Sequence, residues 1–206
     1  MKENIQEMSL IDSLVEDELS DIIYENLKFN EDQMKQIREG LENGVDIQWY
    51  AKPEFSAEQM YQILWGLEQN LDVSVYAKPE FDEGQMAEIR IGLERGLDVS
   101  WYSKLEFNEK QMYQIREGLE AGIDVSIYAK SEFNEEQMEQ IFEGLNFEID
   151  VSEYAKTEFS ANQMEVILLG LEKGLDISEY IDPELSADQM NDIRLELLQQ
   201  QEEMSL

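Results

Sequence analysis

Apolar side chains recur along this chain with the spacing of one helix face, and the pattern restarts at a fixed interval. Met34, Ile37 and Leu41 lie three and four residues apart, which places them on one stripe of an α-helix. Gly44 then supplies the left-handed residue that commonly ends a helix. The same Gln-Met start returns every 26 residues, at Met34, Met60, Met86, Met112, Met138, Met164 and Met190. A fixed period of this kind predicts a repeat protein.

Each copy opens with the signature of a helix start. In the copy that begins at Phe29, the pair Asn30 and Gln33 has the spacing of a capping box, and Phe29 and Met34 have the spacing of a hydrophobic staple. The box recurs as Ser56/Gln59, Asp82/Gln85, Asn108/Gln111, Asn134/Gln137, Ser160/Gln163 and Ser186/Gln189. The first helix of every copy is therefore strongly specified.

A second, shorter segment follows each helix. Asp46 is a strong N-cap residue, so a short helix of one to two turns is expected after it, and Pro53 discourages helix at the residue before it. One such unit cannot bury its apolar stripe alone, whereas stacked units can. The sequence thus predicts an all-α fold, an α-solenoid of stacked 26-residue repeats, each with a long helix, a short helix and a link.

The repeat register predicts a single repeat domain over residues 1–206. It contains a degenerate N-terminal repeat at 3–28, full repeats starting at 29, 55, 81, 107, 133 and 159, and a C-terminal capping helix at 185–204. Glu148 stands where other copies have Gly or Asn, so a strained helix end is expected there. Gly40 and its equivalents lie inside the long helix, where close approach of a neighbouring backbone is the expected reason. The recurrent Tyr residues, such as Tyr50, are expected in the core with one partner for the hydroxyl.

The composition limits the kinds of catalysis and metal binding that the chain can carry out. The chain has no Cys and no His, which removes thiolate chemistry, the commonest general base and the commonest transition-metal ligand. Equivalent carboxylates of neighbouring repeats should lie about 8–10 Å apart, too far to share a Ca²⁺ ion, whose oxygen ligands lie at about 2.3–2.6 Å. We therefore expect no catalytic residues, no metal and no cofactor.

The charge is the most extreme property of the composition. Asp and Glu number 48 against 15 Lys and Arg, a formal net charge of −33, which disfavours direct binding to nucleic acid or an anionic membrane and favours basic partners. No segment approaches the roughly 18 apolar residues of a membrane span, and the first residues lack a signal-peptide core. A cytoplasmic protein is expected.

Function should lie at the positions where the copies differ. A helical wheel turns the positions equivalent to 35 and 39 outward, and large apolar groups at outward positions often mark interaction sites. A varying position of the short helix adds two tryptophans. The candidate protein-binding residues are Trp49, Tyr61, Trp65, Ile91, Trp101 and Tyr113. Tyr61, Trp65 and Ile91 are expected to form one patch. The alternative is that these side chains fill gaps between repeats or pack a homodimer.

The motif resembles a 26-residue helical repeat of bacterial proteins whose function is not established. Phe-Ser-Ala-Glu-Gln-Met at 55–60, Gly-Leu-Glu at 66–68 and Leu-Asp-Val-Ser at 71–74 carry the resemblance, which extends over almost the whole chain and implies no activity. The residues favour a non-enzymatic interaction scaffold or adaptor with an acidic surface.

A DNA mimic that inhibits a DNA-binding protein or defence system is the alternative function. Eight stacked helices would span about 65–80 Å, so 33 net charges amount to about 0.4–0.5 per Å. Duplex DNA carries about 0.6 charges per Å. The two densities are comparable.

Overall fold

The computed structural model describes residues 29–204, and the predicted degenerate repeat at 3–28 lies outside the described residues. The chain divides into two compact units, Met1–Gly96 and Leu97–Leu206, and each is described by itself. Within 29–204 there are seven α-helices and no strand, so the all-α prediction is confirmed. One continuous repeat domain over 1–206 stays a prediction.

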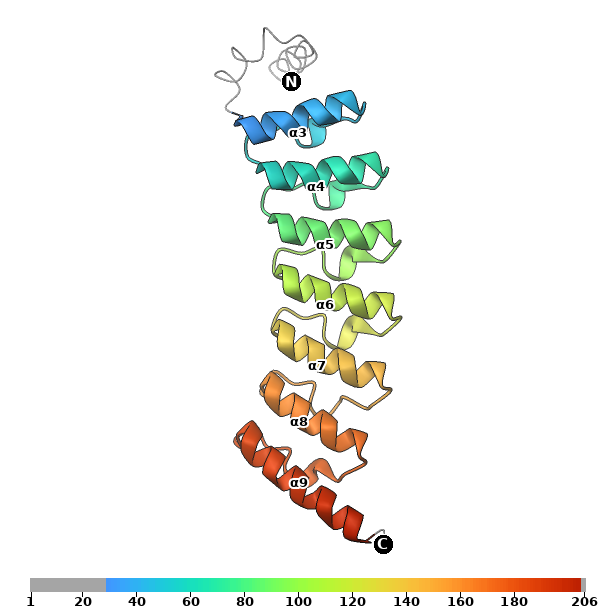
Figure 1. The fold of residues 1–206 in the computed structure, drawn as a ribbon, viewed down its shortest axis with the longest axis vertical. Coiled ribbons are helices and arrows are strands. Elements are labelled where there is room, and N and C mark those ends of the chain that lie inside the picture. Colours follow the sequence, from blue (N-terminus) through green and yellow to red (C-terminus); the bar gives the residue numbers. More distant parts are fainter. Residues whose placement is uncertain (1–28, 205–206) are drawn as a thin grey trace. The chain divides into compact units, whose positions relative to one another are not determined.

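Residues 29–96 of the first unit contain three long helices and two 3-10 turns. They are α3 (Glu31–Glu42), η2 (Ile47–Trp49), α4 (Ala57–Glu68), η3 (Val73–Val75) and α5 (Glu83–Glu94). Helix α4 packs against both α3 and α5. As Figure 1 shows, each link returns the chain to the start of the next helix, so consecutive long helices point the same way.

Residues 97–204 of the second unit repeat this arrangement with four long helices and three 3-10 turns. They are η4 (Val99–Trp101), α6 (Glu109–Glu120), η5 (Val125–Ile127), α7 (Glu135–Asn146), α8 (Ala161–Glu172), η6 (Ile177–Glu179) and α9 (Ala187–Met204). Each of these helices packs against the next, from α6 to α9. This regular stacking of consecutive helices in both units is that of an α-solenoid, as predicted.

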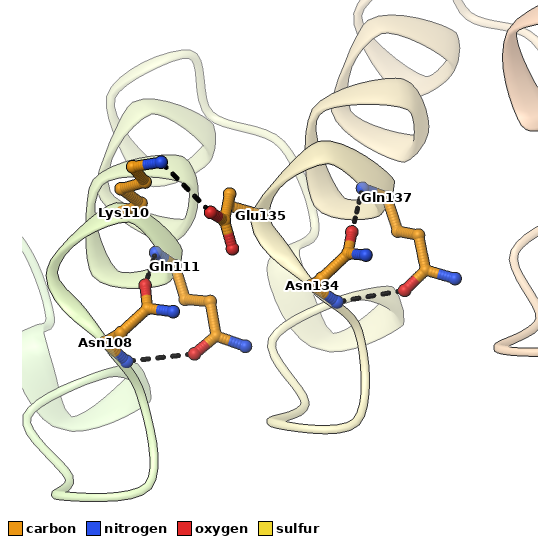
Figure 2. Close-up of polar contacts among 6 residues, drawn as sticks. All are labelled: Asn108, Lys110, Gln111, Asn134, Glu135 and Gln137. Atoms are coloured by element: carbon orange, nitrogen blue, oxygen red, sulfur yellow. Dashed lines mark hydrogen bonds and ion pairs between the residues drawn. The ribbon is translucent and has the colours of Figure 1, made fainter. Parts of the chain in front are cut away.

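The helix starts form as the sequence indicates and also join neighbouring repeats. In α6 and α7, Asn108 accepts from the amide of Gln111 and Asn134 from the amide of Gln137, and each Gln side chain accepts in return from the cap amide (Figure 2). The Nε2 of Gln111 donates in addition to the carbonyl of Phe133 in the next repeat, at 2.6 Å. A capping box accepts Glu or Gln, but only Gln can donate this second bond.

The helix glycines make room for a tyrosine hydroxyl, not for a neighbouring backbone as the sequence led us to expect. A Cβ added at Gly66 would lie 1.9 Å from the Tyr76 Oη. That hydroxyl donates to the carbonyl of Gln62 at 3.1 Å. Burial raises the pKa of Tyr76 well above its ordinary value. The prediction of core tyrosines with one hydroxyl partner is confirmed for Tyr50, Tyr76, Tyr128 and Tyr154. It is wrong for Tyr180, which is buried but whose hydroxyl has no hydrogen-bond partner.

The segment after each long helix is shorter than predicted. Asp46 caps it by accepting from the amide of Gln48, as expected, but η2 has three residues, a single 3-10 turn instead of a helix of one to two turns. Between α7 and α8 only a turn remains. The bulky tyrosine that follows must reach back to the glycine of its own long helix, which leaves no length for a longer helix.

Two predictions about helix ends agree with the structure, the strained end at Glu148 and the position of the last helix. Glu148 adopts φ +59°, a left-handed conformation that costs a non-glycine residue energy. The last helix, predicted within 185–204, runs over Ala187–Met204. None of the helices in residues 29–204 combines the length and the apolar character that a membrane span requires.

Candidate protein-binding face

Tyr61 and Trp65 form an exposed aromatic pair on α4. They lie one turn apart, and their rings meet edge to face with centroids 5.5 Å apart and planes at 87°. Both residues are 39% exposed. Edge-to-face contact suits the quadrupoles of aromatic rings, so the pair holds its geometry while remaining open to solvent.

Arg90 on α5 supports this pair from the neighbouring helix. Its guanidinium lies 4.7 Å from the centroid of the Trp65 ring, a cation–π contact. Its Nε donates to Gln62 Oε1 at 2.9 Å, and its Nη1 forms an ion pair with Glu94. Arg90 is only 8% exposed, so the cation is held between the two helices and fixes one face of Trp65.

The remaining predicted residues are distributed over other elements. Ile91 occupies on α5 the repeat position that Trp65 occupies on α4, and it is half-buried. Trp49 is exposed, but it lies on η2 and not on the helix face that carries Tyr61 and Trp65. In the second unit, Trp101 lies on η4 and Tyr113 on α6, and both are exposed. The structure thus pairs Tyr61 with Trp65, whereas Trp49 lies on another element.

Tyr113 repeats the aromatic–arginine arrangement within a single helix. The guanidinium of Arg116 lies 5.1 Å from the Tyr113 ring centroid, and its Nη1 contacts Glu117 at 3.0 Å and also pairs with Glu120. Arg116 is 4% exposed. Both units therefore hold an outward aromatic ring against a buried guanidinium.

Farther along the second unit, carboxylates occupy three of the four outward positions of α7 and α8, and Leu169 occupies the fourth. The carboxylates are Glu139 and Glu143 on α7 and Glu165 on α8, and Glu172 ends α8. Partial burial and the charges of the other three raise the pKa of Glu143. The first turn of α7 differs, because its own backbone amide and Lys110, 3.2 Å away on α6, lower the pKa of Glu135 (Figure 2).

Sequence reasoning missed the arginines that hold the aromatic rings. Arg90 and Arg116 occupy equivalent positions of their repeats. In other repeats the same position carries a large apolar residue, namely Leu64, Phe142 or Leu168. That alternation is the available signal: a position that accepts both kinds of residue is one where an arginine stem is buried and its head is paired. A wheel alone assigns such a position to the flank of the helix.

Other features of the surface do not coincide with the aromatic pair. A cavity of about 590 Å³ lies at the C-terminal ends of α3 and α4, lined by residues 43–46 and by Leu67, Glu68 and Asn70. Within residues 29–204, no group of three or more carboxylates is placed to hold a metal ion. Comparison of the chain with protein-family models, curated proteins and solved structures found no match.

Proposed function

We propose that this chain is a non-enzymatic scaffold or adaptor that binds a basic protein partner through its variable outward positions. The observation that carries the proposal is the Tyr61–Trp65 pair, which is large, apolar and exposed on an otherwise acidic surface. Hot spots of protein interfaces are enriched in tyrosine, tryptophan and arginine. Exposed aromatic groups of this size are typical of interaction sites.

The contact with Arg90 also holds the exposed Trp65 ring in place before a partner binds. A ring that is fixed before binding loses less side-chain entropy on contact with a partner. The acidic side chains around it would accelerate the approach of a basic partner and make association dependent on salt. Trp49, Ile91, Trp101 and Tyr113 complete the proposed contact set.

The test is partner affinity after removal of the aromatic pair. Partners captured from the native host are purified, and their binding to the wild-type chain and to the Tyr61→Ala/Trp65→Ala double variant is measured by calorimetry. The double variant should bind at least about tenfold more weakly, because each hot-spot aromatic carries a large share of the affinity. Leu105→Ala, at an exposed position of a link, is the control and should leave affinity unchanged. Unchanged affinity of a folded double variant would refute the assignment.

DNA mimicry is the second candidate, favoured by one observation. Helices α7 and α8 contain Glu but no Lys or Arg, so the helices themselves contribute only negative charge. As a mimic, the chain would bind DNA-binding proteins, duplex DNA would compete, and affinity would fall steeply with salt. Partners that stay bound at high salt and are not displaced by DNA would exclude this candidate.

A further inference from the structure

We propose that the outward face of α8 and α9 is a second docking surface, which binds a basic amphipathic α-helix of a partner protein that lies across both helices. Its centre is formed by Leu169 of α8 and by Leu195 and Leu198 of α9, here called the leucine ridge. The inference rests on the proposed protein-binding function, but none of these leucines belongs to the contact set proposed above.

The leucine ridge is an exposed apolar surface on two helices that pack against each other. Leu169 is 36% exposed and Leu195 is 47% exposed, and Leu198, one turn after Leu195, is half-buried. Val166 and Leu168 of α8 are buried, so the inward apolar positions of this helix are already filled. Packing within the second unit therefore does not account for the exposed leucines.

The repeat position of Leu169 carries apolar residues in pairs on neighbouring helices. From α3 to α9 it reads Glu39, Trp65, Ile91, Glu117, Glu143, Leu169 and Leu195. One apolar pair lies on α4 and α5 of the first unit, and the other lies on α8 and α9 of the second. Single apolar residues on a surface need no explanation, whereas a contiguous pair is typical of an interaction site.

The spacing of the leucine ridge suits a helical partner. Stacked helices lie about 8–10 Å apart, so equivalent side chains of α8 and α9 recur at about this interval. On an α-helix, side chains seven residues apart share one face and lie about 10.5 Å apart along the axis. A helix that crosses α8 and α9 therefore places two side chains of one apolar stripe over Leu169 and Leu195.

An extended segment fits the leucine ridge less well. Side chains on one face of a strand recur about every 6.5–7 Å. Addition of a strand also requires a free sheet edge, and residues 29–204 contain no sheet. Polyproline segments dock in grooves lined by aromatic side chains, whereas this ridge consists of leucines. An amphipathic helix is thus the occupant that matches the ridge.

The charges beside the leucine ridge favour a basic helix. Glu165 and Glu172 lie one turn before and one turn after Leu169 on α8. Partial burial and the charges of carboxylates on α7 and α8 raise the pKa of Glu143, so these carboxylates are close enough to repel one another. Lys173, exposed after Glu172, offsets part of this charge. Lysine or arginine side chains that flank the apolar stripe of a partner would be attracted here, and salt would weaken the attraction.

The test uses a defined peptide and a reporter beside the leucine ridge. The probe is an acetylated, amidated helical peptide of alanine, leucine and lysine with leucines at i, i+4, i+7 and i+11. A shuffled peptide of the same composition distributes the leucines around the helix. The chain has no Cys, so Gln199→Cys, exposed and one turn after Leu195, provides a single site for an environment-sensitive dye. Glu132→Cys carries the dye on an exposed link as the reference.

Matched variants separate the leucine ridge from other apolar surface. Leu195→Gln should weaken peptide binding about threefold, and Leu169→Gln/Leu195→Gln about tenfold, because the apolar area that the peptide buries is lost. Leu105→Gln removes an even more exposed leucine, 56% exposed, from a link of the same unit and should weaken binding less than about twofold. Leu169→Met/Leu195→Met keeps the ridge apolar and should retain affinity.

The flanking charge should contribute a smaller part. At about 150 mM salt, where the Debye length is about 8 Å, Glu165→Gln should weaken peptide binding about twofold. Glu132→Gln removes the same charge from an exposed link and should leave binding unchanged.

Four outcomes contradict the inference. Equal binding of the shuffled peptide would mean that net charge alone attracts the probe. Equal weakening by Leu195→Gln and Leu105→Gln, or no response of the dye at Gln199→Cys, would place the peptide elsewhere on the chain. Tighter binding of a proline-rich peptide with the same number of lysines would mean that the occupant is not a helix.

The result is separable from the test of the aromatic contact face. Tyr61→Ala/Trp65→Ala changes the other unit and should leave the dye response at Gln199→Cys intact. If that double variant loses its captured partners while the peptide shows no specific binding, this inference alone is refuted. If the peptide binds specifically while the double variant retains its partners, the proposed contact face alone is refuted.

Discussion

The helix pairs α4–α5 and α7–α8 are built from the same repeat and differ at the same few outward positions. In the first pair, Arg90 of α5 donates a hydrogen bond to α4 and its guanidinium lies over the Trp65 ring. In the second pair, Leu168 takes its place and Glu143 stands where Trp65 stands. The scaffold residues, from the capping glutamines to the buried methionines, are equivalent in both. The comparison shows that one scaffold can carry an aromatic face and an acidic face.

The largest effect should come from the scaffold, and it should be equal in the two pairs. Gly66→Ala and Gly144→Ala would each place a Cβ about 2 Å from a buried tyrosine hydroxyl, 1.9 Å from Tyr76 and 2.1 Å from Tyr154. We expect each to lower the free energy of unfolding by about 2–3 kcal/mol, because overpacking of a core outweighs the better helix propensity of alanine. Urea denaturation followed by circular dichroism measures it.

A double variant identifies the cause of that loss. Gly66→Ala/Tyr76→Phe lacks the hydroxyl that meets the new methyl group, so it should be less destabilised than the two single changes added together. Strict additivity would mean that the contact with the hydroxyl is not the cause of the loss. A large difference between the α4 and α7 variants would mean that the two scaffolds are not equivalent.

A smaller effect should come from converting the first pair into the second. Arg90→Leu leaves Gln62 Oε1 and Glu94 without their donor, and we expect a loss of about 1–2 kcal/mol in the free energy of unfolding. The emission of Trp65 should change as well, since the guanidinium leaves its ring. Arg38→Leu changes the same repeat position on α3, where the arginine is exposed, and should alter stability by less than about 0.5 kcal/mol. Equal losses in both variants would show that the pairing of Arg90 contributes nothing.

The smallest effect should be the pH dependence of the acidic face. The pKa of Glu143 is raised in the folded state, so its charged form lowers stability at neutral pH, and this penalty disappears as pH falls from the raised value toward the ordinary 4.5. Glu143→Gln should therefore be more stable than the wild type at pH 7 by less than about 1 kcal/mol. The difference should vanish below the ordinary value. Thermal unfolding across this range measures it.

The control for the pH experiment is Glu132→Gln in an exposed link. It removes one charge without altering the face, so its stability should follow the wild type through the same range. If the advantage of Glu143→Gln persisted unchanged at low pH, the cause would be packing and not ionisation.

Most of the helical framework could be predicted from the sequence because its causes are local. Capping boxes act over three residues, and the apolar stripe acts over two turns, so each copy specifies its own helix. The Asp residue that caps each short segment also acts locally, but the predicted length of that segment was wrong. That length depends on where Tyr76 must place its hydroxyl, a constraint that comes from another element of the fold.

The sequence by itself determined the repeat, the helix starts, the left-handed end at Glu148 and the outward direction of Tyr61 and Trp65. Only the tertiary structure decided how neighbours share their polar groups. Gln111 reaches a carbonyl of the next repeat, Arg90 reaches an amide oxygen of the preceding one, and Gln140 finds no donor at all. These contacts join residues more than 20 positions apart in the chain. The spacing of the sequence specifies each helix, and the stacking of two helices specifies which side chains meet.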